Sequence, residues 1–171
     1  TSYRAAINYQ KQDGIIKHTG KEEYSGRVNL TITPYKWLTT NMNLSYAQMD
    51  RTEPNNAYVG GGLDQIIRQT NRVAPWIPYK NEDGSYGTIS DGNPIAWLDM
   101  GPQINNQRKT FVGIGSMQIT PIADLNIKAL VSHRNVESDN SEMNKEIQYN
   151  PSKYHGPTKL TKKLSTNTRN T

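Results

Sequence analysis

The stretch that most constrains this fold runs from Glu22 to Met49 and alternates between two kinds of residue in two arms. One parity is mostly aliphatic, and the other carries only arginine, asparagine, threonine and serine over most of its length. Strict period-two alternation predicts two strands, each with one apolar and one polar face. Each arm is about as long as the 9–11 residues that a tilted strand needs to cross a bilayer. The apolar parity consists of Val28, Leu30, Ile32, Leu38, Thr40, Met42, Leu44 and Tyr46.

We predict that a turn over residues 34–36 joins the two arms, because Pro34 cannot sit in a central ladder but can turn the chain. The simplest register then pairs Leu30 with Thr40 and Val28 with Met42. The Ile-Thr-Pro-x-x-x-Leu pattern of this turn recurs at residues 119–125, so we expect a second hairpin of the same kind, with Met117 opposite Ile127. Val28, Leu30, Met42, Leu44, Ile127 and Val131 should then share one face, and Asn29, Asn41, Asn43, Asn126 and Lys128 the other.

The connections between the expected strands alternate in length along the chain. Those at 34–37 and 121–124 are short, whereas those at 11–23, 50–107 and 137–166 are longer. This sorting is typical of an outer-membrane barrel, with short periplasmic turns and long extracellular loops. We therefore predict an all-β fold: an antiparallel transmembrane β-barrel segment of about five strands. Residues 1–171 would be part of a barrel domain, and residues 50–107 a long extracellular loop that contains a short helix.

Composition argues against several other functions. The chain has no cysteine, and its three histidines lack ligand spacing, so we expect neither a metal nor another cofactor. Glu82 and Asp83 are adjacent in a turn and point apart, so no acid pair for catalysis is expected. The net charge of +5 comes from a basic C-terminal stretch, which we interpret as a solvated loop, and nothing in the sequence indicates nucleic-acid binding.

The long connection carries three short motifs in a fixed order, and their order is more specific than any one of them. The motifs are Pro75-Trp76-Ile77-Pro78-Tyr79, Asn81-Glu82-Asp83-Gly84-Ser85-Tyr86-Gly87 and Asn93-Pro94-Ile95-Ala96. Together they resemble a recurring loop of the SusC/RagA-type TonB-dependent transporters of Bacteroidetes. The opening strand and the Asp13-Gly14-Ile15-Ile16-Lys17 turn resemble the same family.

This resemblance implies active import of large nutrients, commonly glycans or peptides, across the bacterial outer membrane. It implies energy delivered through TonB and a SusD-like surface lipoprotein that covers the extracellular loops. Members of the family are much longer, with a plug and a TonB-contacting segment, so we expect this chain to be a middle section. The resemblance implies no catalytic residue.

Four aromatic residues of the long connection are the candidate contacts to ligand or lipoprotein, because large rings with polar tips suit sugar faces and partner interfaces. The alternative for each ring is that it only packs the loop on itself. Two other functions stay open at this point: a non-transporting β-rich surface adhesin or carbohydrate-binding module, and a carbohydrate-active enzyme on a β-sandwich. The four candidates are Trp76, Tyr79, Tyr86 and Trp97.

Overall fold

The computed structural model of the chain is built around one antiparallel sheet of six strands. It describes residues 1–55, 62–87, 92–100, 103–150, 153–155 and 158–171. The sheet has the order β1-β2-β3-β4-β5-β8, and β6 and β7 form a small second sheet. The elements are β1 (Ser2–Asp13), β2 (Gly20–Tyr35), β3 (Leu38–Pro54), α1 (Gly62–Thr70), α2 (Pro94–Met100), β4 (Gln103–Ile122), β5 (Leu125–Asn144), β6 (Ile147–Asn150), β7 (Lys153–His155) and β8 (Lys159–Asn170).

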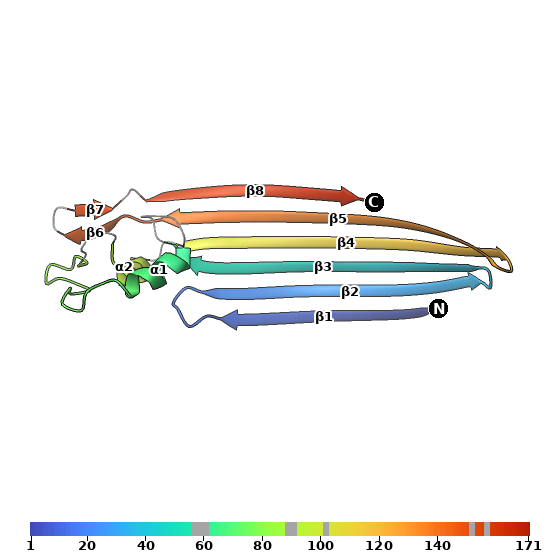
Figure 1. Cartoon of the computed structure of the whole chain (residues 1–171), viewed down its shortest axis with the longest axis horizontal. Helices are drawn as coiled ribbons and strands as arrows, with labels where there is room; N and C mark the ends of the chain where they lie inside the picture. Colours follow the sequence, from blue (N-terminus) through green and yellow to red (C-terminus); the bar gives the residue numbers. More distant parts are fainter. Residues whose placement is uncertain (56–61, 88–91, 101–102, 151–152, 156–157) are drawn as a thin grey trace.

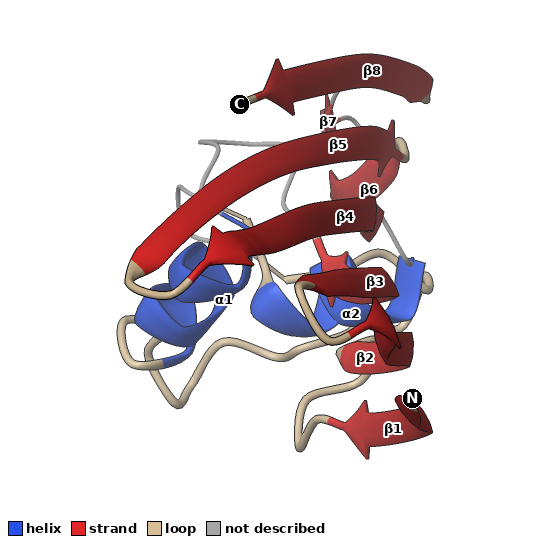
Figure 2. Cartoon of the chain, turned by 90° about the vertical axis from the view of Figure 1, so that its right-hand side faces the viewer, coloured by secondary structure: helices blue, strands red, loops and turns tan. Residues whose placement is uncertain are grey.

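The six long strands lie in one row, and the two ends of the sheet differ (Figure 1). One end carries the tight turns between β2 and β3 and between β4 and β5. The other end carries both helices and the small β6–β7 sheet, and the end-on view places α1 to one side of the row of strands (Figure 2). The antiparallel sheet confirms the all-β class, with six long strands rather than about five. Neither helix of the described part of the chain has the length and hydropathy of a membrane span.

The predicted division of the sheet into two faces is confirmed. The ladder pairs Leu30 with Met42 and Val28 with Leu44, and Met42 continues through Gly115 to Val131. Because residues paired across a ladder point to the same side of the sheet, this ladder defines one apolar face. On the polar face, Asn29 lies opposite Asn43, Asn41 lies opposite both Thr31 and Ser116, and Lys128 lies opposite Gln118. Cross-strand hydrogen bonds join Thr31 Oγ1 to Asn41 Oδ1 (2.8 Å) and Asn41 Nδ2 to Ser116 Oγ (3.4 Å).

The register predicted for the two hairpins was wrong by two residues in each. Leu30 was expected opposite Thr40 but pairs with Met42, and Met117 was expected opposite Ile127 but pairs with Ala129. The reason is that each strand continues through its proline in an irregular stretch, between Ile32 and Tyr35 and between Ile119 and Ile122. Proline without an N–H is accommodated at such a bulge, and the chain turns at residues 36–37 and 123–124 instead.

Several strands are longer than the sequence pattern indicated. β3 runs on to Pro54, β4 begins at Gln103 instead of Arg108, and β5 ends at Asn144. The interpretation of the basic C-terminal stretch as a loop was wrong over most of its length, because it forms β8 from Lys159 onward. It pairs with β5 from His133 to Asn144, so its lysines and arginine lie on a sheet rather than in a loop.

Candidate functional site

The long connection between β3 and β4 folds into a unit with a core of its own at the end of the sheet away from the tight turns (Figure 1). Trp97 of α2 is fully buried, and its Nε1–H donates to the Tyr149 hydroxyl at 3.0 Å. The Tyr86 amide donates to the Gln148 carbonyl at 3.0 Å, so residues about sixty positions apart hold the unit together. The core consists of Ile66, Tyr86, Ala96, Trp97, Ile147 and Tyr149.

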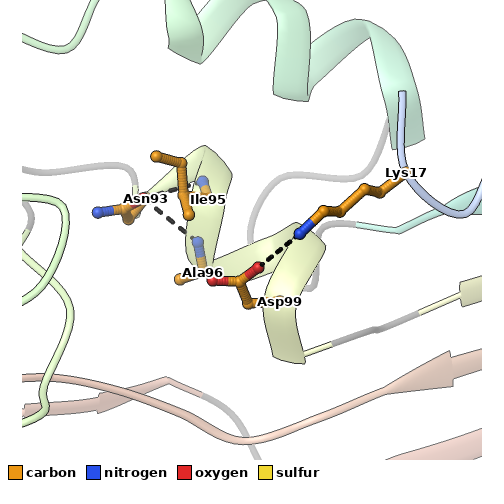
Figure 3. A network of polar contacts seen from close by, with 5 residues as sticks. All are labelled: Lys17, Asn93, Ile95, Ala96 and Asp99. Carbon is orange, nitrogen blue, oxygen red and sulfur yellow. Dashed lines mark hydrogen bonds and ion pairs between the residues drawn. The ribbon is translucent and has the colours of Figure 1, made fainter. Parts of the chain in front are cut away.

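Helix α2 has Asn93 as its N-cap and Pro94 as its first residue (Figure 3). The Asn93 side-chain oxygen accepts from the amides of Ile95 (2.9 Å) and Ala96 (3.3 Å), which satisfies two donors that the helix itself leaves free. Gly92 precedes the cap with a positive φ of 92°. A Cβ there would lie 2.7 Å from Cζ2 of Trp97, so the buried indole requires glycine at this position.

An ion pair connects α2 to the loop between β1 and β2. Lys17 Nζ lies 3.5 Å from Asp99 Oδ1, and the lysine is largely exposed (Figure 3). An exposed pair of this kind contributes at most about 1 kcal/mol. It therefore marks where the two loops meet without fixing them there.

Glu82 and Asp83 lie in a turn, as the sequence predicted, and this turn spans residues 81–85. The Asn81 amide donates to the Ser85 carbonyl at 2.7 Å, and the Gly84 amide donates to the Asn81 carbonyl at 3.0 Å. The Asp83 carboxylate accepts from the Ser85 hydroxyl (2.6 Å) and amide (2.9 Å), and these hydrogen bonds lower the pKa of Asp83. Asp83 thus serves the turn as a charged hydrogen-bond acceptor.

The four aromatic residues proposed as contacts divide into two pairs. Trp76 is 81% exposed and Tyr79 is 58% exposed, in the segment that follows α1. Tyr86 is 8% exposed and Trp97 is 0% exposed, and both belong to the core of the loop unit. Burial raises the pKa of the Tyr86 phenol. The contact role therefore stays a prediction for Trp76 and Tyr79, whereas Tyr86 and Trp97 pack the unit on itself.

The loop unit lies against the polar face of the sheet at this end. Leu63 of α1 shares a cavity of about 390 Å³ with Lys21, Met49 and Glu53, which all belong to the polar face at this end of the sheet. Buried Asn55, just after β3, donates from Nδ2 to Glu142 Oε1 (2.8 Å) and Asn144 Oδ1 (2.7 Å) of β5. The unit is thus attached to the sheet on both sides of β4.

Sequence reasoning missed the contribution of residues 145–150. Ile147 and Tyr149 are buried and alternate with Gln148, which is a short strand pattern that was available in the sequence. Within the described ranges, no group of three or more histidine, cysteine, aspartate or glutamate side chains is placed to hold a metal ion. Parts of the expected loop, at 56–61, 88–91 and 101–102, lie outside the described residues.

These features define a class: a long-stranded antiparallel sheet with one apolar and one polar face, whose long loops gather at one end. No protein-family model matches the chain, and no solved structure matches it. The chain is 32% identical over 152 residues to the TonB-dependent receptor P26 of Formosa agariphila. The match covers 84% of this chain but only 14% of that receptor. The similarity supports the TonB-dependent receptor family and does not reach the SusC/RagA subdivision.

Proposed function

We propose that this chain is a stretch of the wall of an outer-membrane transporter that imports large nutrients with energy delivered through TonB. The observation that carries the proposal is the apolar face of a sheet that no second layer covers among the described residues. Val28, Met42, Ile127 and Val131 of this face are exposed. A soluble sandwich or enzyme would bury such a face against protein, so lipid is the cover that accounts for it.

The height of the apolar band supports this assignment. On β3 the band runs from Leu38 to Tyr46, and the next residues of the same face are Gln48 and Asp50. Nine residues at about 3.4 Å each reach roughly 30 Å along the strand. A strand tilt of about 40° reduces this to roughly 23 Å, close to the apolar band of about 25 Å in outer-membrane barrels. The part of β3 beyond Tyr46, at the end of the sheet that carries the loop unit, then lies outside the membrane.

Aromatic residues lie at both limits of the band, where barrels of this kind carry aromatic girdles. At the tight-turn end, Tyr35 and Trp37 stack with ring centroids 5.2 Å apart. At the other limit, Tyr9 and Tyr24 are paired across β1 and β2 with centroids 4.8 Å apart.

In this proposal the connection at 50–107 is extracellular, and a SusD-like surface lipoprotein covers it. Glycans or peptides are the proposed cargo. Trp76 and Tyr79 are exposed beside a stretch with two prolines, which gives a rigid apolar surface that suits a sugar face or a partner interface. The contact to TonB would come from a segment of the protein outside these residues.

Two double variants of the full-length transporter test the proposal. Trp76→Ala with Tyr79→Ala removes the exposed rings of the loop unit. Tyr35→Ala with Trp37→Ala is a matched control, because it removes one exposed tyrosine and one exposed tryptophan at the opposite end of the sheet. Each is compared for heat-modifiable folding in the outer membrane and for growth on the nutrient whose use requires the wild-type gene.

We expect the loop variant to fold and insert like wild type but to lose at least tenfold in uptake per inserted molecule. The control should keep uptake per inserted molecule, whatever its effect on the amount inserted. Unchanged uptake in the loop variant would remove the role given to Trp76 and Tyr79. Recovery of the wild-type protein outside the outer membrane would overturn the proposed function as a whole.

A further inference from the structure

The two faces of the six-stranded sheet carry opposite net charge. Ten basic and three acidic residues lie on the polar face, an excess of seven positive charges, whereas three basic and five acidic residues lie on the apolar face. The polar-face bases are Arg4, Lys21, Arg27, Arg51, Arg108, Lys128, Arg134, Lys159, Lys163 and Arg169, and the acids are Glu23, Glu53 and Glu142. The charged residues of the apolar face are Lys11, Lys109, Lys162, Asp13, Glu22, Asp50, Glu137 and Asp139.

Three of these arginines lie in one row across the sheet. The ladder runs from Arg27 through Ser45 and Val112 to Arg134 and then to Arg169. With strands about 4.8 Å apart, the row extends over roughly 19 Å from β2 to β8. It therefore presents several guanidinium groups at one height of the wall.

Arg134 and Arg169 lie directly opposite each other, an arrangement that is destabilising for like charges. Lys21 and Arg51 also lie opposite each other, but each has its own glutamate: Lys21 Nζ is 2.8 Å from Glu23, and Arg51 is 2.9 Å from Glu53. Over the described ranges, Arg134 and Arg169 have no such carboxylate. The sheet thus neutralises one opposed basic pair and leaves the other without an anion.

Arg4 joins the row at the other edge of the sheet. It pairs with Asn29, and Arg27 pairs with Ala6, so the two arginines are diagonal neighbours, about 7–8 Å apart at Cα. Both line a hollow of about 430 Å³, and Arg27 also lines an adjoining hollow of about 330 Å³. Small side chains such as Ala6, Ser25 and Ser45 leave this space open. No salt bridge to Arg4 or Arg27 is present in the part of the chain that the structure describes.

We propose that this arginine row binds oxyanion groups of the imported solute, so that the substrate class is a polymer or oligomer bearing carboxylate, sulfate or phosphate groups. The inference rests on the proposed function, because it takes the polar face as the wall of the channel. Guanidinium groups suit such anions, since their planar fork donates two parallel hydrogen bonds. Several arginines are spread over roughly 19 Å. A solute chain with repeated anionic groups can contact all of them, whereas a single carboxylate from elsewhere in the protein can contact only one part of the row.

Dextran sulfate and neutral dextran of the same length form a matched pair of probes, because they differ only in sulfate esters. Their binding to the purified full-length protein in detergent is measured by isothermal titration calorimetry at two salt concentrations. We expect dextran sulfate to bind at least tenfold more tightly than dextran, and its affinity to fall as salt rises, because salt screens charges. The variants R4Q/R27Q and R134Q/R169Q should each weaken binding at least tenfold.

Lys109→Gln is the matched control, since Lys109 is a base of the same sheet on the apolar face. It should bind dextran sulfate like wild type. Equal binding of the two probes, or equal loss in K109Q and the arginine variants, would overturn the inference. The inference would also be overturned if the arginine variants melted at a lower temperature than wild type but bound dextran sulfate like wild type. The arginines would then stabilise the protein by binding an acidic segment of its own chain. The assay needs neither membrane nor TonB, so its failure leaves the proposed function standing.

Discussion

Replacing Trp97 should open the loop unit without affecting the sheet. Trp97 is fully buried, and its Nε1–H donates to the Tyr149 hydroxyl at 3.0 Å. Trp97→Ala removes a large buried ring, which costs about 3–5 kcal/mol in a protein core. Trp97→Phe keeps most of the ring and removes the hydrogen bond, for which about 1 kcal/mol is expected. Tyr149→Phe removes the same hydrogen bond from the other side, for a similar cost.

Hydrogen exchange on the full-length protein measures this effect directly, because local opening can be far easier than global unfolding. Amides of α2 (Pro94–Met100) should exchange more than a hundredfold faster in Trp97→Ala, since every 1.4 kcal/mol is a factor of ten. Amides in the centre of β3 and β4 should exchange as in wild type. The double variant W97F/Y149F should cost less than the two single changes added together, because both remove one interaction.

Trp76→Ala is the control, since its exposed ring makes little difference to stability. Exchange in α2 that stays within twofold of wild type in Trp97→Ala would refute the role of Trp97 as the centre of the unit. Faster exchange throughout β3 and β4 would also refute it, because the loop unit would then not be a separate element.

Three further predictions concern the turn, the faces and the isolated segment. The hydrogen bonds from Ser85 lower the pKa of Asp83, so the charged carboxylate stabilises the turn at neutral pH, and this contribution is lost as the pH falls through the lowered pKa. Asp83→Asn should therefore reduce the protection of the amides at 81–87 from exchange at neutral pH. It should also make that protection less sensitive to acidification. Met42→Arg should reduce the folded, heat-modifiable protein in the outer membrane, at a cost of about 2–4 kcal/mol on a lipid-facing strand, while Asn43→Arg should fold like wild type. The 171-residue segment alone in water should aggregate, because β1 and β8 are open edges of the described sheet; a monomer that melts cooperatively would contradict this.

The two faces of the sheet could be predicted from the sequence, but the exact register could not. The alternation from Arg27 to Tyr46 fixes which side chains share a face, and an even shift in register leaves that division unchanged. The shift itself depends on how the chain passes Pro34 and Pro121, which the alternation does not determine. Strand β8 was mostly missed because Leu160 and Leu164 give it too weak an apolar pattern.

The loop core and the arginine row were hidden for a different reason. Trp97 meets Tyr149 across 52 positions, and Arg27 reaches Arg169 only through four successive ladder pairings. Such contacts depend on the register of every intervening strand, which the sequence alone leaves open. For this reason the sequence analysis named Trp97 as a candidate contact, whereas the structure places it at the centre of the core of the loop unit.

The most direct test of this account asks which solvent each face of the sheet meets. These 171 residues contain no cysteine, so once any cysteine elsewhere in the full-length protein is replaced by serine, single cysteines for spin labels can be placed at consecutive positions 40–46 of β3 in that protein, reconstituted in lipid vesicles. Electron paramagnetic resonance then compares collisions with oxygen, which enters lipid, and with a water-soluble nickel complex. We predict that labels at even positions, such as Met42 and Leu44, collide mainly with oxygen, and that labels at Asn41 and Asn43 collide mainly with nickel or are shielded. Water accessibility at Met42 and Leu44 equal to that at Asn41 and Asn43 would contradict the assignment of the apolar face to lipid.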